Sequence, residues 1–160
     1  MCGIAGVIYK DKKTHAVGDA LTSMLESLQH RGPDSAGYAI YGGLNFTENY
    51  YQLNIEVNRR KGTLENLKSL LTQFSPIYEE QLIESVGGSD VYKCKIALDD
   101  FSRLQPCIME IDELENVRVI NGSHSFEMIK DVGKVKDIAE RFDVQSRMGT
   151  HGIGHTRFAT

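Results

Sequence analysis

The chain has 160 residues, of which 41% are hydrophobic and 25% charged, and its formal net charge is −4. This composition is typical of a globular domain, and without a basic excess the sequence does not predict nucleic acid as a partner. Because the sequence has neither an apolar run of about 18 residues nor a signal-peptide pattern, we expect a cytoplasmic protein with no membrane segment.

The first predicted element is a buried strand over residues 2–9, and it begins at Cys2. The small Gly3 makes Met1 a good substrate for removal, which would leave Cys2 as the first residue. A terminal cysteine carries both a thiol and an α-amine, and an amine with a pKa of about 8 can accept the thiol proton at neutral pH. Cys2 is therefore either an N-terminal nucleophile or a small buried cysteine at the start of a strand.

Next in the chain are a helix, a polar loop and a second strand. Apolar residues recur at three- and four-residue spacing over residues 17–30, which predicts an amphipathic helix. Gly32 and Pro33 end this helix, and residues 36–41 read as a strand. The loop over residues 31–35 is dense in polar side chains, as site-building loops often are.

The middle of the chain, residues 48–132, has a different pattern. It predicts strands at 50–57 and 90–98, a helix at 63–74, further short strands at 107–111 and 117–120, and a helical turn at 125–130. A β-α-β-β order favours a small α+β module, for which a ferredoxin-like topology is one candidate.

No catalytic or metal-binding pattern stands out in this middle region. Its scattered acidic residues read as carboxylate pairs, as metal ligands or, with more support, as a solvated surface beside turns. These residues are Glu79, Glu80, Asp99, Asp100, Glu110, Asp112, Glu113 and Glu115. The three cysteines include no C-x-x-C pair, so Cys94 and Cys107 read as structural, and we expect neither a metal nor a cofactor.

The last segment contains a helix over residues 134–142 and a glycine-rich strand over residues 151–159. We expect this to be a central strand with His155 and Arg157 on the same side, because they are two residues apart. The structural alternative is a hydrogen-bonded core histidine and a surface or ion-paired arginine. A metal site at His151 and His155 is disfavoured, because histidines four apart converge on a helix and this segment is too rich in glycine to form one.

Three motifs along the chain carry a family resemblance. They are Cys2-Gly3-Ile4-Ala5-Gly6, Gln29-His30-Arg31-Gly32-Pro33-Asp34-Ser35-Ala36-Gly37 and Gly154-His155-Thr156-Arg157-Phe158-Ala159-Thr160. Together, in this order, they resemble the N-terminal signatures of class II glutamine amidotransferases, which belong to the Ntn-hydrolase superfamily. The wide gap before the third motif is similar to the branch of stand-alone amidotransferase subunits in glutamate-synthase-like systems, such as N-methylglutamate synthase.

The resemblance implies an α+β fold, the four-layer αββα sandwich of Ntn hydrolases. Residues 1–47 and 133–160 would form the amidotransferase domain, incomplete at its C-terminus, and residues 48–132 would be an inserted α+β module. It further implies that the chain is the glutaminase part of an enzyme that hydrolyses L-glutamine to glutamate and ammonia and passes the ammonia to a synthase partner.

The family roles transfer to four residues of this sequence. Cys2 would be the catalytic nucleophile and would form a thioester with the glutamine side chain. Arg157 would bind the substrate α-carboxylate, and Thr160 would help to hold the same end of the substrate. Arg31 matches a position near the nucleophile and would orient it and line the pocket.

The sequence departs from the family pattern after Thr160, where an Asn-Gly pair for the oxyanion hole and an aspartate for the substrate amine are expected. The pair Asn121-Gly122 lies before the third motif, so we read it as a turn. We therefore expect weak or no activity from the 160 residues alone, as the front part of a longer enzyme or with a second chain supplying the rest.

Two further functions remain as alternatives. One is a non-catalytic binding or regulatory module that retains the amidotransferase fold. The other is an Ntn amidohydrolase for a different amide, which Arg157 and Thr160 disfavour.

Overall fold

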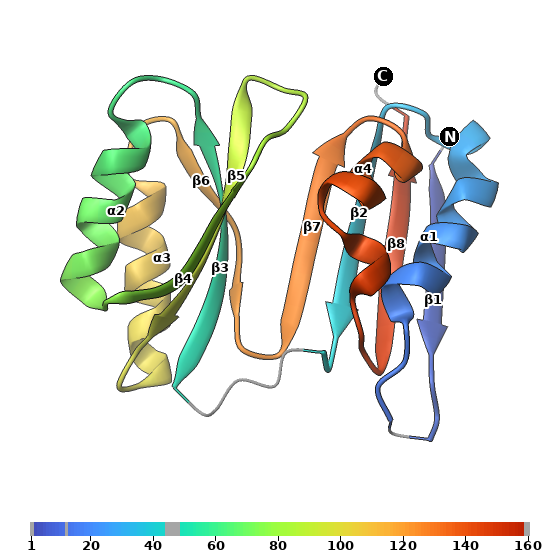
Figure 1. Ribbon diagram of the computed structural model, residues 1–160, viewed down its shortest axis with the longest axis horizontal. Helices are drawn as coiled ribbons and strands as arrows, with labels where there is room; N and C mark the ends of the chain where they lie inside the picture. Colours follow the sequence, from blue (N-terminus) through green and yellow to red (C-terminus); the bar gives the residue numbers. More distant parts are fainter. Residues whose placement is uncertain (1, 12, 44–48, 159–160) are drawn as a thin grey trace. The chain divides into compact units, whose positions relative to one another are not determined.

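The computed structural model describes residues 2–11, 13–43 and 49–158, and it divides into two compact units (Figure 1). Residues 1–45 and 125–160, the two ends of the sequence, make up one unit, which we call the outer unit. Residues 46–124, the middle of the sequence, make up the other, which we call the inner unit. None of the helices in the described ranges is both long enough and apolar enough to cross a membrane.

The outer unit is an antiparallel sheet with helices on one face. Its elements are β1 (Gly3–Ile8), α1 (Val17–Leu28), the 3-10 turn η1 (Gln29–Arg31), β2 (Ser35–Tyr41), β7 (Phe126–Val132), α4 (Val135–Arg141), the 3-10 turn η3 (Val144–Ser146) and β8 (His151–Arg157). The strand order is β1-β8-β2-β7, so β8 lies in the interior of the sheet as predicted. Figure 1 shows α1 and α4 on the same side of this sheet.

The glycines of β8 allow α1 to pack closely on the sheet. Gly152 and Gly154 are buried and face the helix. A Cβ atom on Gly154 would lie 2.6 Å from Leu25 Cδ1, and one on Gly152 would lie 2.8 Å from Val17 Cγ1. Real Cβ atoms do not approach other atoms so closely, so a larger residue at either position would force its neighbours to move. At Gly152 one of these neighbours is the Ala39 carbonyl oxygen, 2.9 Å from the added Cβ, which belongs to the backbone of β2.

None of the described helices of the outer unit packs on the other face of the outer sheet, and this face is largely apolar. Ile4 and Ile8 on β1 are 73% and 70% exposed, and Val132 on β7 and Ile153 on β8 are 56% and 53% exposed. Strand side chains alternate between faces, so all four point away from α1 and α4. We call this surface the open face of the outer sheet.

The inner unit has a β-α-β-β-α-β element order. Its elements are β3 (Tyr50–Asn58), α2 (Thr63–Phe74), β4 (Ile77–Ile83), β5 (Ser89–Ala97), the 3-10 turn η2 (Phe101–Arg103), α3 (Leu104–Asp112) and β6 (Val117–Ser123). The sheet order β4-β5-β3-β6, antiparallel throughout, is the ferredoxin-like arrangement. Residues from the sheet and from both helices, including Leu53, Ile55, Leu71 and Ile111, form one buried core.

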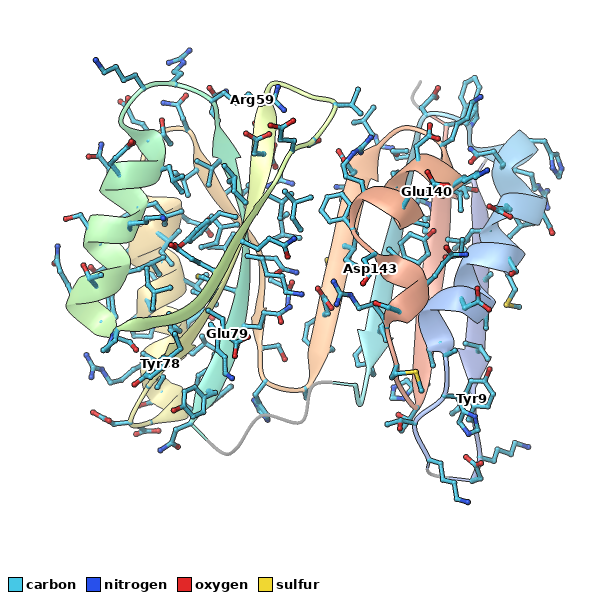
Figure 2. All side chains as sticks on the ribbon, in the orientation of Figure 1. Tyr9, Arg59, Tyr78, Glu79, Glu140 and Asp143 are labelled. Atoms are coloured by element: carbon cyan, nitrogen blue, oxygen red, sulfur yellow. The ribbon has the colours of Figure 1, made fainter. Side chains whose placement is uncertain are left out.

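Two elements of the inner unit differ from the sequence-based prediction. Residues 107–111 were expected to be a strand but lie in α3, where Leu104, Cys107 and Ile111 form a buried helical stripe. Short apolar runs do not by themselves distinguish a strand from a buried helix. The strand β4 was missed because most of it is exposed, as Tyr78 and Glu79 are in Figure 2.

The predicted turn at Asn121-Gly122 is also wrong. Both residues lie inside β6, where they pair with Asn54 and Leu53 of β3. Asn121 is 7% exposed, and a Cβ atom on Gly122 would lie 2.7 Å from Leu53 Cδ2. This glycine therefore serves close packing of the strand and not the reversal of the chain.

The second boundary between the units lies at residue 125, and the sequence had suggested 133. Residues 125–130 were expected to form a helical turn, but β7 runs through them and pairs with β2. Its buried positions include two carboxylates, Glu127 and Asp131, which interact with Arg147 and Arg141 of the same unit. These buried charges disguise the apolar alternation that identifies a strand.

Candidate active site

The pairing of three strands brings the three sequence motifs to one end of the outer sheet. Gly3 at the start of β1 pairs with Thr156 near the end of β8, and Ser35 at the start of β2 pairs with Arg157. Cys2 immediately precedes β1, so it lies at the same end of the sheet as Arg157 (Figure 1). Residues more than 100 positions apart in the sequence are thus neighbours in the fold.

The loop of the second motif is tied to the end of β8 by backbone contacts. The Asp34 N–H donates to the Arg157 carbonyl oxygen at 3.2 Å, and the Gly133 N–H donates to the Asp34 carbonyl oxygen at 2.9 Å. Gly32 packs directly on β8, since a Cβ atom there would lie 2.5 Å from the Arg157 nitrogen. Only glycine allows the loop to approach the strand this closely.

Gln29 holds the same loop from its other side. Its side-chain Nε2 donates to the Gly32 carbonyl oxygen at 3.0 Å, and its Oε1 accepts from the Val135 N–H at the start of α4 at 2.6 Å. Gln29 lies in the second motif, but the sequence predicts no role for its side chain. No local pattern reveals this role, because its partner Val135 is far away in the sequence.

His155 and Arg157 share the open face of the outer sheet, as their spacing predicts. Arg157 is exposed and His155 is half-buried, whereas Thr156 between them is fully buried against α1. A hollow of about 280 Å³ runs over β2, β7 and β8, and its lining includes Gly37, Met128 and both of these residues. His155 is therefore not enclosed in the core.

Cys2 is exposed, and the other two cysteines are buried in the inner unit. Burial raises the pKa of the Cys94 thiol to about 12 and that of the Cys107 thiol to about 11. A buried thiol with a raised pKa is almost entirely protonated at neutral pH and is chemically inert. Of the three thiols, only that of Cys2 is open to a substrate.

The remaining predicted site residues are placed less fully. Arg31 is exposed and ends the 3-10 turn η1, immediately before Gly32. Thr160 lies outside the described residues. His151 stacks on Tyr41 with ring centroids 4.7 Å apart, and the described ranges contain no cluster of three or more His, Cys, Asp or Glu side chains arranged to hold a metal.

Part of the chain is similar to a known protein family. Residues 1–55 match the glutamine amidotransferase domain. The match includes the first two motifs, with β1, α1 and β2, and it ends within β3. The third motif, with Arg157, lies beyond the matched residues.

Two curated relatives align with the whole chain and carry names that agree with this amidotransferase match. A putative glutamine amidotransferase of Methanothermobacter thermautotrophicus is 58% identical over 160 residues, which cover 52% of its length. The glutamine amidotransferase-like protein GlxB of Rhizobium meliloti is 32% identical over an alignment that covers 50% of its length. The chain therefore spans about half the length of the curated relatives it matches.

One solved structure, the uncharacterized protein TM1266 from Thermotoga maritima, matches with a TM-score of 0.40 and 17% sequence identity. The alignment covers 47% of this chain and 94% of that protein. A similarity of this size supports no inference about function.

Proposed function

We propose that this chain carries the glutaminase site of a class II, N-terminal-nucleophile glutamine amidotransferase. The observation that carries the proposal is the convergence of Cys2, the loop over residues 31–35 and Arg157 at one end of the outer sheet. A thiol immediately before β1 and a cation on the neighbouring strand β8 suit a substrate with an amide at one end and a carboxylate at the other. Glutamine is such a substrate.

In the proposed reaction, Met1 is removed and the α-amine of Cys2 takes the proton of its own thiol. The sulfur then attacks the side-chain carboxamide carbon of glutamine and forms a tetrahedral intermediate. The C–N bond breaks, ammonia leaves with the transferred proton, and a thioester remains. Water then attacks the thioester, which releases glutamate and restores the thiol.

Arg157 would hold the substrate α-carboxylate through two parallel hydrogen bonds from its guanidinium group. Such bidentate, charge-assisted pairs are stronger and more directional than a lysine contact. The exposed position of Arg157 at the end of β8 supports this role, because its charge is open to a ligand. Arg31 would line the nucleophile side of the pocket, and Thr160 would join Arg157 at the carboxylate end.

The proposal extends to the four-layer αββα architecture. The open face of the outer sheet supports it, because that face exposes Ile4, Ile8, Val132 and Ile153, and a second antiparallel sheet would bury them. We also propose that the ammonia passes to a synthase-type partner. The oxyanion-hole donors are not assigned within these 160 residues, since Asn121 is buried in the inner sheet, so we expect the isolated chain to be a poor glutaminase.

The test is an assay of ammonia and glutamate formation from L-glutamine by the protein at its native length. Cys2→Ala should abolish both products. Arg157→Lys should raise KM for glutamine about tenfold or more, with a smaller effect on kcat, since it weakens ground-state binding of the carboxylate. Arg118→Lys in the inner unit is the matched control and should change neither parameter.

Intact-mass measurement on the same protein tests the terminal-amine step, and loss of Met1 is the expected result. Full activity with Met1 retained would refute this step. Glutamine binding by calorimetry without ammonia release would instead favour a binding module that retains the amidotransferase fold.

A further inference from the structure

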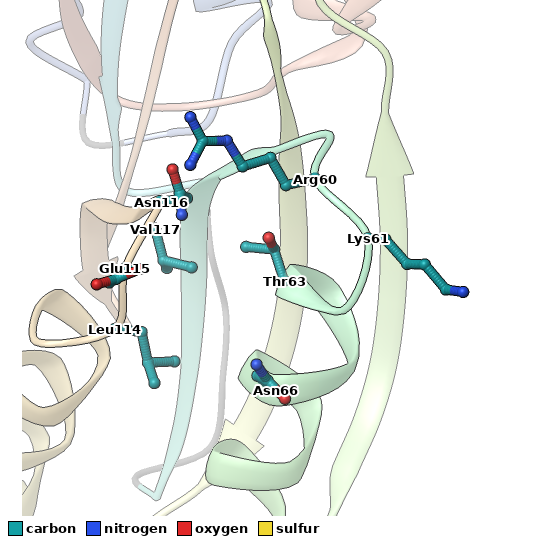
Figure 3. A pocket seen from close by; sticks show the side chains of 8 residues that line it. All are labelled: Arg60, Lys61, Thr63, Asn66, Leu114, Glu115, Asn116 and Val117. Atoms are coloured by element: carbon teal, nitrogen blue, oxygen red, sulfur yellow. The ribbon is translucent and has the colours of Figure 1, made fainter.

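The inner unit contains a pocket that the proposed glutaminase site does not use. Its volume is about 450 Å³, within the range of small-molecule sites, and it lies beside the first turn of α2 (Figure 3). Its lining consists of Arg60, Lys61, Thr63, Asn66, Leu114, Glu115, Asn116 and Val117. One wall comes from residues 60–66, and on the other wall the apolar side chains of Leu114 and Val117 lie next to the polar Glu115 and Asn116.

The first turn of α2 is left open to a ligand. The helix has 12 residues, and its N-cap is Gly62 at φ +88°, a conformation that favours glycine and supplies no capping side chain. Within the described part of the chain, the N–H groups of Leu64 and Glu65 have no hydrogen-bond partner. Together with the helix dipole, they concentrate partial positive charge at this end of α2.

Thr63 supplies an independent indication of a ligand. It is only 7% exposed, yet no described residue accepts or donates a hydrogen bond at its hydroxyl. In Figure 3 this hydroxyl points towards the part of the pocket between Arg60 and Asn116. A polar side chain that is more than nine-tenths buried normally has a partner, so an unpartnered hydroxyl that opens onto a pocket indicates where a ligand would bind.

The charges around the pocket favour an anion. Arg60 makes no ion pair with any described residue, and its guanidinium lies on the pocket side of the loop, whereas Lys61 points away (Figure 3). The adjacent Arg59 is not available in the same way, because its guanidinium is bound to Asp90. The negative charge of Glu115, which also lines the pocket, repels an anion. Removing this charge should therefore strengthen anion binding, which offers a second test.

From these features we infer that the inner unit binds a small organic phosphate. Its phosphate group lies at the start of α2, where it accepts hydrogen bonds from the Thr63 hydroxyl and the Arg60 guanidinium. The apolar part of the ligand contacts Leu114 and Val117. Helix N-termini with a nearby cation are established phosphate sites in proteins.

Inorganic phosphate is the probe for the test. The protein at its native length, labelled with ¹⁵N, is titrated with phosphate, with acetate and with sodium chloride at matched ionic strength. We expect saturable shifts of the Thr63, Leu64 and Glu65 amides with phosphate, with a Kd on the order of 1 mM, weaker shifts with acetate and none with chloride.

Four single variants separate a built site from general attraction to basic residues. Arg60→Gln should weaken phosphate binding about tenfold, and Thr63→Val should weaken it severalfold, whereas Thr63→Ser should retain binding. Glu115→Gln should strengthen binding about twofold, because it removes a repulsive charge. The inference is supported only if the affinity for phosphate falls in Arg60→Gln and rises in Glu115→Gln.

Arg103→Gln is the matched control. Arg103 follows β5, whose last residue Ala97 pairs with the first residue of β3, so it lies at the opposite end of the inner sheet from Arg60. This variant should bind phosphate like the wild type. The inference would be overturned if Arg60→Gln and Arg103→Gln lost phosphate affinity equally. It would also be overturned if the amide shifts with phosphate were no larger than those with chloride. If Thr63→Val fails to fold, the variants of the exposed Arg60 and Glu115 still decide the matter.

Discussion

The Gln29 side chain accepts a hydrogen bond at 2.6 Å from the backbone N–H of Val135, a residue 106 positions later in the chain. Through this bond the end of α1 is joined to the start of α4. Since Gln29 also donates to the Gly32 carbonyl oxygen, the same side chain fixes the loop that lies against Arg157. Gln29 thus holds in place a loop of the candidate site.

Gln29→Ala should destabilise the protein by about 1–3 kcal/mol, because the Val135 N–H at a buried position loses its acceptor. Gln29→Glu keeps an acceptor for the Val135 N–H but loses the donor to the Gly32 carbonyl oxygen, so this variant should lose less stability than Gln29→Ala. Urea unfolding at pH 7, followed by circular dichroism, measures both. Equal losses in the two variants would contradict the assigned role of the Val135 contact.

Gly154→Ala should destabilise the outer unit by about 1–3 kcal/mol, because the added methyl group would overlap the side chain of Leu25, which projects from α1 onto the sheet. The matched control is Gly6→Ala on the open face, where the nearest atom to the new Cβ would be the Gly152 carbonyl oxygen at 3.5 Å. That change should stay within about 0.5 kcal/mol. Thermal unfolding of both variants, compared with the wild type, provides the measurement. A similar loss of stability in both variants would mean that the lower preference of alanine for these strand positions, and not the contact with Leu25, causes the destabilisation.

Alkylation by iodoacetamide at pH 8 should modify Cys2 at least about 100-fold faster than Cys94 or Cys107 in the folded chain. Cys2 is exposed, whereas burial raises the pKa of Cys94 to about 12 and that of Cys107 to about 11. Very little reactive thiolate therefore forms at the two buried positions. Peptide mapping by mass spectrometry identifies the modified thiols, and unfolding in urea should expose all three. Rapid native labelling of Cys94 would contradict the burial described for the inner core.

The stability that the Arg59–Asp90 pair contributes should depend on pH. Arg59 Nη2 donates to Asp90 Oδ1 at 2.6 Å, and this contact lowers the pKa of the Asp90 carboxyl group below its ordinary value (Figure 2 labels Arg59). Stabilisation from a lowered carboxyl pKa is complete above the unfolded value of about 3.9, and it is lost as pH falls through the folded value. Asp90→Asn should therefore cost more at pH 7 than near pH 2.

Urea unfolding of the wild type and of Asp90→Asn at both pH values tests this expectation. Asp99→Asn is the control, because the Asp99 side chain is 98% exposed and lies 3.8 Å from Arg103. Its effect should be small and nearly constant with pH. A cost for Asp90→Asn that does not change between the two pH values would show that the ion pair contributes no net stability.

Elements with one strong apolar period were predicted correctly from sequence. The helix faces around Leu21 and Leu67 and the alternation along β5 match the structure within a few residues. The errors fall where the local pattern is ambiguous or masked. In α3 a short apolar run fits the period of a helix as well as that of a strand. In β7 the buried Glu127 and Asp131 interrupt the apolar alternation of the strand, and their ion pairs with Arg147 and Arg141 compensate the burial of the two charges.

The candidate site shows the same division. Their motifs single out Cys2, Arg31 and Arg157 as candidates, and their roles stay predictions. The motifs do not predict the hydrogen bond of Gln29, because it depends on the distant Val135. The anion pocket beside α2 was also missed. Its walls come from residues 60–66 and 114–117, and α3, which precedes the second wall, had been predicted as a strand.

By itself, the sequence determined which residue types are available: an early cysteine, two arginines in polar motifs and glycines in the strand before Arg157. It also determined most of the local secondary structure, because a period of 2 or 3.6 reports which face of an element is buried. Only the tertiary structure decided that Cys2, Gly32 and Arg157 meet at one end of a sheet and that β7 joins the outer unit. Strand pairing between distant segments depends on long-range hydrogen bonds and packing, which no local pattern encodes.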